Sequence, residues 1–249
     1  MGSIYTLPAA RLCILLVSGF MIGLSKTAVP GLGTLAVTLS AMALPARAST
    51  GIVLVMLICG DVFAVAYYRR NAVWTHLLRL FPYAIAGIII GYVLLGKIDD
   101  SQLRPAIGLI ILCMLALNYW WKKQDTEKIN IPSRWWFAAF MGLIAGTTTM
   151  LANAAGPIMI IYLLAMGLPK KEFIGTGAWY FFLANLFKVP FSANLGLINT
   201  SSLKINVMTL PAIALGAVLG IVILKKIPER AFNIIVQILT AAAALKLLF

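Results

Sequence analysis

Apolar runs follow one another along almost the whole chain, separated by short polar stretches. Ten runs can be drawn, and they cover about residues 12–24, 32–45, 50–68, 75–96, 104–121, 135–149, 156–168, 173–191, 205–224 and 230–248. Hydrophobic residues make up 62% of the sequence and charged residues only 11%, which excludes an ordinary soluble domain. Because lipid offers no partner to an exposed backbone amide, continuous apolar runs cross it as helices. The sequence therefore predicts an all-α polytopic membrane protein.

Two polar interruptions separate pairs of these runs. The first is Ser25–Gly33, and Thr147–Pro157 is a weaker copy of it. A spanning helix needs about 20 residues, and the runs on either side of each interruption are shorter. We expect a broken or re-entrant helix pair at each place, although thin tilted spans would also fit the lengths. Paired interruptions in two halves of a chain indicate the substrate site of a transporter.

The two halves of the chain repeat each other. Residues 41–45 return as 165–169, an offset of 124, and residues 82–98 return as 211–227, an offset of 129. Each half holds five runs, an odd number, so the second repeat should be inverted relative to the first. Counting each interrupted pair as one broken span would instead make the repeats parallel. The predicted organisation is a first transmembrane repeat at 1–121, a cytoplasmic linker at 122–134 and a second transmembrane repeat at 135–249.

The lysines and arginines of the loops predict the orientation. With Lys26 and Lys188 set aside as intramembrane candidates, twelve of them follow the third, fifth, seventh and ninth runs, and six lie on the opposite side. The richer side is cytoplasmic by the positive-inside rule, which places both termini outside. The net charge of +13 thus reflects topology and contact with anionic membrane lipid. We expect no nucleic-acid partner.

Asp61 is the only acidic residue well inside an apolar run. An intramembrane carboxylate is costly unless it is paired, wetted or protonated, which makes it a functional hypothesis by default. The offset of 124 places Asn185 at the equivalent position of the second repeat. Two interpretations remain open: Asp61 couples transport to a proton or cation, or it forms a structural salt bridge with Lys26 or Lys188 or caps a broken helix.

Two lysines could hold an anion. Lys26 lies within the first interruption, and Lys188 follows Asn185 by one helical turn. An ammonium group beside the N-termini of two half-helices would suit an oxyanion, because the free amides there donate and the helix dipoles add positive charge. The alternative is that either side chain snorkels to the interface. Lys188 lies near the end of a run and fits snorkelling equally well, so Lys26 is the stronger candidate.

Hydroxyl and amide side chains around the interruptions could bind a polar solute, although some must repair the opened backbone. Glycines there let the backbone bend or approach a ligand closely. Glycine pairs at 87/91 and 216/220 indicate helix packing instead. The predicted substrate-binding residues are Lys26, Thr27, Gly31, Gly33, Thr149, Asn153, Gly156, Asn185 and Lys188, with Asp61 for coupling.

Enzyme functions find little support in the sequence. The single histidine, His76, has no triad or HExxH partners, and no phosphate-binding loop is present. The three cysteines, Cys13, Cys59 and Cys113, are isolated within apolar runs and lack metal-ligand spacing. We expect a protein that is not an enzyme and that carries no metal or cofactor.

Several stretches resemble one family of membrane transporters. They are Gly23–Thr27 with Pro30–Gly33, Gly60–Arg70, Pro82–Gly91, Thr149–Pro157, Gly175–Trp179 and Asn185–Pro190. The chain is similar over nearly its whole length to the TauE/SafE family, the sulfite and organosulfonate exporter group. The resemblance implies a multi-pass protein of the cytoplasmic (inner) membrane that moves small anions such as sulfite or sulfoacetate.

These observations predict a secondary transporter, an exporter of small anions, with a midplane site between the two repeats and proton coupling through Asp61. An anion channel, or a transporter of another small organic solute, would share much of this chemistry. A membrane enzyme or a scaffold that transports nothing is a further alternative, but it lacks reactive residues. The predicted partners are a small anionic solute and membrane lipid, with a homodimer possible through the glycine-marked helices.

Overall fold

The computed structural model describes residues 8–27, 31–123, 135–223 and 229–248, and in these residues the regular secondary structure is entirely helical. The elements are α1 (Ala9–Thr27), α2 (Leu32–Ala43), α3 (Ala46–Tyr68), the 3-10 helix η1 (Arg69–Asn71), α4 (Trp74–Lys97), α5 (Asp100–Lys123), α6 (Trp135–Ala152), α7 (Gly156–Ala165), α8 (Lys170–Asn194), α9 (Thr200–Ile223) and α10 (Glu229–Leu248). Residues 28–30 of the first interruption and 124–134 of the predicted linker lie outside the described part of the chain.

Six of these helices are long and apolar enough to cross a bilayer, namely α1, α3, α4, α5, α6 and α9. Large apolar side chains are exposed on the outer surface, among them Leu78, Val207 and Leu215. Exposed apolar surface on this scale is compatible with lipid as the surrounding solvent but not with water. The predicted all-α, multi-pass membrane protein is thereby confirmed.

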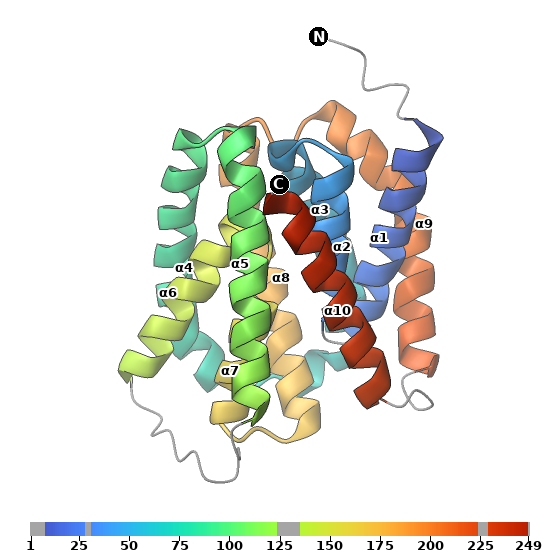
Figure 1. The fold of residues 1–249 in the computed structure, drawn as a ribbon. Coiled ribbons are helices and arrows are strands. Elements are labelled where there is room, and N and C mark those ends of the chain that lie inside the picture. The colour runs from blue at the N-terminus through green and yellow to red at the C-terminus, as the bar shows by residue number, and fades with distance from the viewer. Residues whose placement is uncertain (1–7, 28–30, 124–134, 224–228, 249) are drawn as a thin grey trace.

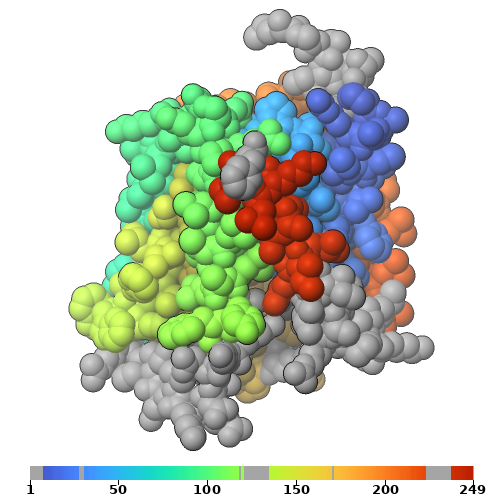
Figure 2. Space-filling model, viewed as in Figure 1, coloured from blue at the N-terminus to red at the C-terminus, as the bar shows by residue number. Residues whose placement is uncertain are grey.

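The helices form one bundle with both described chain ends toward the same end of it. The start of α1 and the end of α10 lie toward the upper end in Figure 1, whereas α3, α5 and α7 finish at the lower end. In the same view, α5 and α10 cover the front of the bundle (Figure 2). The placement of the two chain ends agrees with the predicted topology. Which end faces the cytoplasm stays a prediction.

Two long helix pairs, α1 with α9 and α4 with α6, are packed through glycine. A Cβ atom on Gly23 would lie 2.1 Å from the Ile213 carbonyl oxygen, and one on Gly216 would lie 2.1 Å from that of Phe20. The α4–α6 contact uses Gly87 and Gly146 in the same way. The predicted packing role of the glycines at 87 and 216 is confirmed. Both are used within the chain, so the predicted homodimer would need other surfaces.

The interrupted pairs differ from their predicted form. Helices α1 and α6 have 19 and 18 residues and are long enough to span, so the expectation that both members of each pair are short is wrong for them. Only α2 and α7, with 12 and 10 residues, are too short. The hydroxyl residues are accommodated inside the long helices with their polar groups satisfied by the preceding turn: Thr27 Oγ1 donates to Gly23 O, and Thr148 Oγ1 donates to Ile144 O. Lys26 therefore lies in the last turn of α1 and not in a loop.

Candidate functional site

A buried ion pair joins the end of α1 to the middle of α3. Lys26 Nζ lies 2.7 Å from Asp61 Oδ1, with the Asp61 side chain fully buried and that of Lys26 13% exposed. The lysine stem passes along Gly60, where an added Cβ would lie 3.0 Å from Lys26 Cγ. Lys26 Nζ also lies 4.4 Å from the centroid of the Phe181 ring on α8, which is cation–π distance. Lys26 thus contacts both α3 and α8.

Asp61 is also bonded to its counterpart in the second repeat. Asn185 Nδ2 donates to Asp61 Oδ2 at 2.7 Å, and the two residues are 124 apart in the sequence. Asn185 is 1% exposed. The residues that the repeat predicts to be equivalent therefore meet directly between α3 and α8, in the interior of the bundle.

Lys188 is the second cation of the cluster, and its surroundings contain only neutral acceptors. Its ammonium donates to Asn153 Oδ1 at 2.6 Å, to Thr149 Oγ1 at 3.1 Å and to Asn185 Oδ1 at 3.3 Å. The side chain is fully buried, so the alternative that Lys188 snorkels to the interface is wrong. Among the described residues, no acidic side chain pairs with it.

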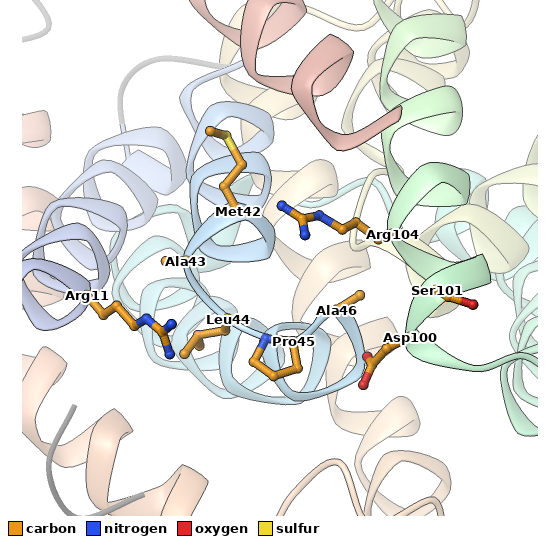
Figure 3. A pocket seen from close by; sticks show the side chains of 9 residues that line it. All are labelled: Arg11, Met42, Ala43, Leu44, Pro45, Ala46, Asp100, Ser101 and Arg104. Atoms are coloured by element: carbon orange, nitrogen blue, oxygen red, sulfur yellow. The ribbon is translucent and has the colours of Figure 1, made fainter. Parts of the chain in front are cut away.

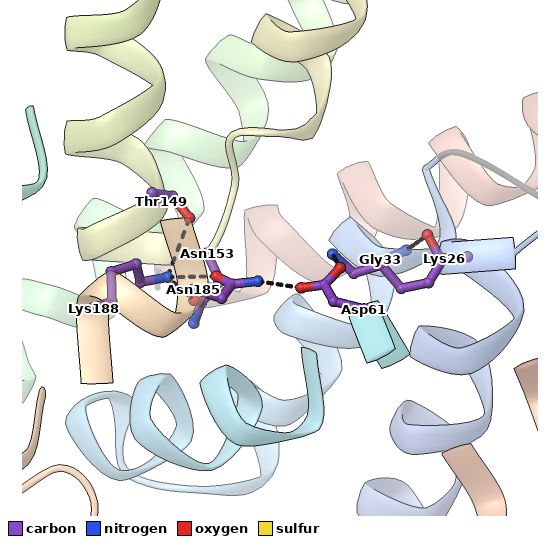
Figure 4. Close-up of polar contacts among 8 residues, drawn as sticks. Lys26, Gly33, Asp61, Thr149, Asn153, Asn185 and Lys188 are labelled. Carbon is purple, nitrogen blue, oxygen red and sulfur yellow. Dashed lines mark hydrogen bonds and ion pairs between the residues drawn. The ribbon is translucent and has the colours of Figure 1, made fainter. Parts of the chain in front are cut away.

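These contacts form one continuous polar chain across the protein, shown in Figure 4. It runs from Lys26 through Asp61 and Asn185 to Lys188, and on to the end of α6 and the turn that follows it. In that turn Asn153 adopts a positive φ of 51° and its amide donates to the Thr50 carbonyl oxygen at 3.1 Å. The turn is therefore anchored to α3 as well as to Lys188.

The short helices α2 and α7 begin with unusual caps. Neither the N-cap Gly31 nor the N-cap Ala155 offers a side-chain hydrogen bond, although the Ser25 hydroxyl accepts from Gly33 N at 3.0 Å. A Cβ added to Gly31, which has a φ of 109°, or to Gly156 would meet no atom of the described residues within 4 Å. Space is thus open beside the first residues of both helices, where free amides carry partial positive charge.

Four of the predicted site residues, Thr27, Gly31, Gly33 and Gly156, lie outside the hydrogen-bonded cluster. Thr27 is 2% exposed, its hydroxyl donates to Ala217 O at 2.9 Å, and its carbonyl oxygen accepts from the Tyr68 hydroxyl at 3.2 Å. Thr27 therefore fastens α1 to α9 and α3. Lys26, Asp61, Thr149, Asn153, Asn185 and Lys188 are the predicted residues that the structure brings into one network.

Gly60 and Phe181 are contacts of Lys26 that the sequence analysis missed. The sequence position of each residue could have indicated its contact with the cluster. Gly60 directly precedes the only intramembrane acid, and Phe181 lies four residues before Asn185 and so shares its helix face.

The electrostatics of the cluster are unequal between its two ends. When all groups are ionised, Lys26 and Asp61 neutralise each other, and Lys188 contributes one positive charge that no described acid balances. Buried charges are costly unless paired and hydrogen-bonded. The hydrogen bonds from Lys188 to three oxygens solvate it but do not cancel its charge. The arrangement is therefore suited to accept an anion.

No group of three or more histidine, cysteine, aspartate or glutamate side chains that could hold a metal ion occurs among the described residues. The cluster instead consists of two ammonium groups, one carboxylate, two amides and a hydroxyl. These groups can bind and exchange an ion or a polar solute. They do not form a nucleophile–base pair of the kind that hydrolases use.

The fold and the site define a multi-pass helical membrane protein with a charged polar network in its interior. The family described as sulfite exporter TauE/SafE matches residues 15–247, and the chain belongs to this family. The resemblance recognised from the sequence motifs is confirmed over nearly the whole chain. A comparison with curated proteins found no match. The TauE/SafE family is a transporter family and not an enzyme family.

Proposed function

We propose that this protein is a secondary transporter that exports small oxyanions, such as sulfite or organosulfonates, across the cytoplasmic membrane. The observation that carries the proposal is Lys188, a fully buried lysine side chain with three neutral oxygen partners and no acidic partner among the described residues. A buried positive charge of this kind favours an arriving anion, which supplies the missing counter-charge at low dielectric.

The bound anion would lie within reach of both lysines and of the open spaces beside Gly31 and Gly156. Free amides at the starts of α2 and α7 would donate to its oxygens, and the two helix dipoles would add to the attraction. Thr149 and Asn153 would then exchange their bonds to Lys188 for bonds to the solute. Half-helix N-termini directed at an anionic group are a recurring device of secondary transporters.

Alternating access would come from two inverted repeats that move against each other. The packing is reciprocal, which supports this proposal: α1 of the first repeat lies along α9 of the second, and α6 of the second lies along α4 of the first. The cluster lies where α3 and α8 meet, so a rocking motion of one repeat would open it to either side in turn.

Asp61 would couple a proton to transport through its ion pair. As a carboxylate it holds Lys26, so the cluster carries one net positive charge and would be neutralised by a monoanion. Protonation of Asp61 would release Lys26 and raise the net charge to two, which suits a dianion. The membrane potential, inside negative, favours export of a monoanion by about 2.3 kcal/mol per 100 mV.

The test is efflux of sulfite and sulfoacetate from proteoliposomes that contain purified protein. We expect saturable efflux that is lost in Lys188→Met, which keeps the side-chain volume and removes the charge. Lys246→Ala, which removes an exposed lysine of α10, is the matched control and should transport normally. Non-saturating flux would favour the channel. Equal efflux from Lys188→Met and wild type would contradict the proposal.

A further inference from the structure

A polar cavity lies at one end of the bundle, separate from the central cluster. It has a volume of about 410 Å³ and lies where α2 passes into α3 and where α5 begins (Figure 3). Its lining residues are Arg11, Met42, Ala43, Leu44, Pro45, Ala46, Asp100, Ser101 and Arg104. Arg11 and Lys26 are 15 residues apart on α1, or about 22 Å at 1.5 Å per residue, so the cavity is distinct from the central cluster.

Two arginines face this cavity from opposite walls. Arg11 reaches in from α1 and Arg104 from α5, and both side chains point toward the α2–α3 corner between them (Figure 3). Neither guanidinium has a hydrogen-bond or ion-pair partner among the described residues. Within the described part of the chain, the donors of both guanidinium groups are therefore available for a ligand.

Arg47 and Asp100, two other charged residues at this end of the bundle, are already engaged. Arg47 Nη1 donates to the carbonyl oxygens of Leu95 and Ile98, both at 2.7 Å. It therefore caps carbonyl groups at the C-terminus of α4. Asp100 Oδ1 accepts from the Arg47 backbone N–H at 2.7 Å, at the start of α3. The only acid that lines the cavity is thus bonded to a helix N-terminus, and the two arginines outnumber it.

The neighbouring Asp99 is engaged as well. Its carboxylate accepts from the Ser101 hydroxyl at 2.6 Å and from Gln102 N at 2.9 Å, and the Gln102 side chain accepts from Asp99 N, which is a capping box at the start of α5. The hydrogen bond from Ser101 holds the pKa of Asp99 below its ordinary value. Asp99 therefore caps the N-terminus of α5 and is not a partner of Arg11 or Arg104.

We propose that this cavity binds an oxyanion, a phosphate or sulfonate group, between Arg11 and Arg104. Guanidinium groups form two parallel hydrogen bonds to such oxygens. The volume matches the cavities that hold small ligands or a headgroup. The cavity lies at the helix ends, where a membrane-spanning bundle would meet the lipid headgroups, so the oxyanion comes either from an anionic phospholipid or from a free solute.

The experiment compares the purified full chain with Arg11→Gln/Arg104→Gln in nanodiscs and in detergent. The matched control is Lys97→Gln, which removes an exposed cation at the same end that does not line the cavity. Thermal unfolding is followed with phosphatidylglycerol against phosphatidylcholine, and separately with inorganic phosphate and sulfoacetate. The soluble anions are tested in a Lys188→Met background, so that the central cluster does not contribute.

We expect either phosphatidylglycerol or the soluble anions to raise the melting temperature of the protein with the wild-type cavity and of Lys97→Gln. Binding of the same probe should be about tenfold weaker in Arg11→Gln/Arg104→Gln. An effect of phosphatidylglycerol alone identifies lipid as the source, and an effect of phosphate or sulfoacetate identifies a free solute. Arg11→Lys/Arg104→Lys keeps the positive charges but removes the paired donors of the guanidinium groups, so it should retain part of the rise in melting temperature. If both probes act equally on the double variant and on Lys97→Gln, the proposal is wrong.

Discussion

The two ends of the central cluster are built on equivalent helices, yet they differ by one charge. On α3, Asp61 meets Lys26 in an ion pair of 2.7 Å, whereas on α8 the equivalent residue is Asn185, which is neutral and accepts from Lys188 at 3.3 Å. Residues 124 apart in the sequence therefore meet here, but the aspartate-to-asparagine difference leaves a protonated Lys188 without an acidic partner among the described residues. The two ends of the cluster thus differ in their electrostatics.

The lysines also reach the cluster by different routes. Lys26 comes from α1 and approaches Asp61 from a neighbouring helix, whereas Lys188 follows Asn185 on the same helix. The offset of 124 relates Lys26 to Met150 and Lys188 to Ala64, so neither lysine has a charged counterpart in the other repeat. The two ends consequently differ in how strongly their lysine is held and in whether that lysine has a counter-charge when a ligand arrives.

The largest expected effect is on stability. Lys26→Met leaves the buried Asp61 without its counter-charge and should cost about 3–5 kcal/mol in unfolding free energy. Lys188→Met removes a charge that has no acidic partner, so its cost should be clearly smaller. Thermal unfolding in detergent measures both. The double variant Lys26→Met/Asp61→Asn should recover most of the loss, and equal destabilisation by the two single lysine variants would refute the asymmetry.

The next effect would come from making the two ends alike. Asn185→Asp places a second carboxyl group beside Asp61, whose Oδ2 accepts from Asn185 Nδ2 at 2.7 Å in the wild type, so the two acids share one proton. The carboxyl group that stays ionised lies between the two lysines and gives Lys188 an acidic partner at short range. We expect anion binding to weaken by about tenfold or more, because the arriving anion then competes with a fixed carboxylate. Isothermal titration with sulfite or sulfoacetate measures the change. Unaltered affinity in a folded Asn185→Asp protein would show that the charge of Lys188 does not hold the ligand.

The helix positions could be predicted closely from the sequence, because apolar run length is a local property. The run at 50–68 became α3 at Ala46–Tyr68, and the run at 75–96 became α4 at Trp74–Lys97. The offset of 124 between repeats also singled out Asp61 and Asn185 as equivalent positions, and the structure adds that these two residues are hydrogen-bonded to each other. These features depend on periodicity and self-similarity, which a single sequence contains.

The environments of the two lysines could not be predicted in the same way. Lys26 reaches Asp61 because Gly60 leaves room for its stem and because glycines hold α1 against α9, and both are properties of packing between distant segments. Lys188 is buried because α8 lies in the interior against α3, which its place near the end of an apolar run does not indicate. Local sequence therefore identified the polar residues and named Lys26 as one of two candidate partners of Asp61, but it did not identify the partners of Lys188.

A smaller effect concerns the pH dependence of transport. If Asp61 takes up the coupling proton, lower pH adds a positive charge to the cluster, and efflux of a dianion should rise as the pH falls. Asp61→Asn mimics the protonated, neutral side chain, so its transport should no longer vary with pH while anion binding persists. Efflux of sulfoacetate, which stays a dianion from pH 5 to pH 8, is measured over this range in proteoliposomes. A wild-type pH profile in Asp61→Asn would remove Asp61 from the coupling role.

The smallest effects should come from two glycines that border the two ends of the cluster. Gly60→Ala pushes a Cβ to 3.0 Å from Lys26 Cγ, so we expect a loss of about 1 kcal/mol in stability as the ion pair is displaced. Gly156→Ala meets open space at the start of α7 and should gain up to about 1 kcal/mol, because alanine loses less backbone entropy on folding. If that space receives the anion, Gly156→Ala should nevertheless weaken anion binding. Thermal unfolding and titration of the same samples separate the two effects. A Gly156→Ala protein that is more stable and binds the anion normally would place the ligand away from the start of α7.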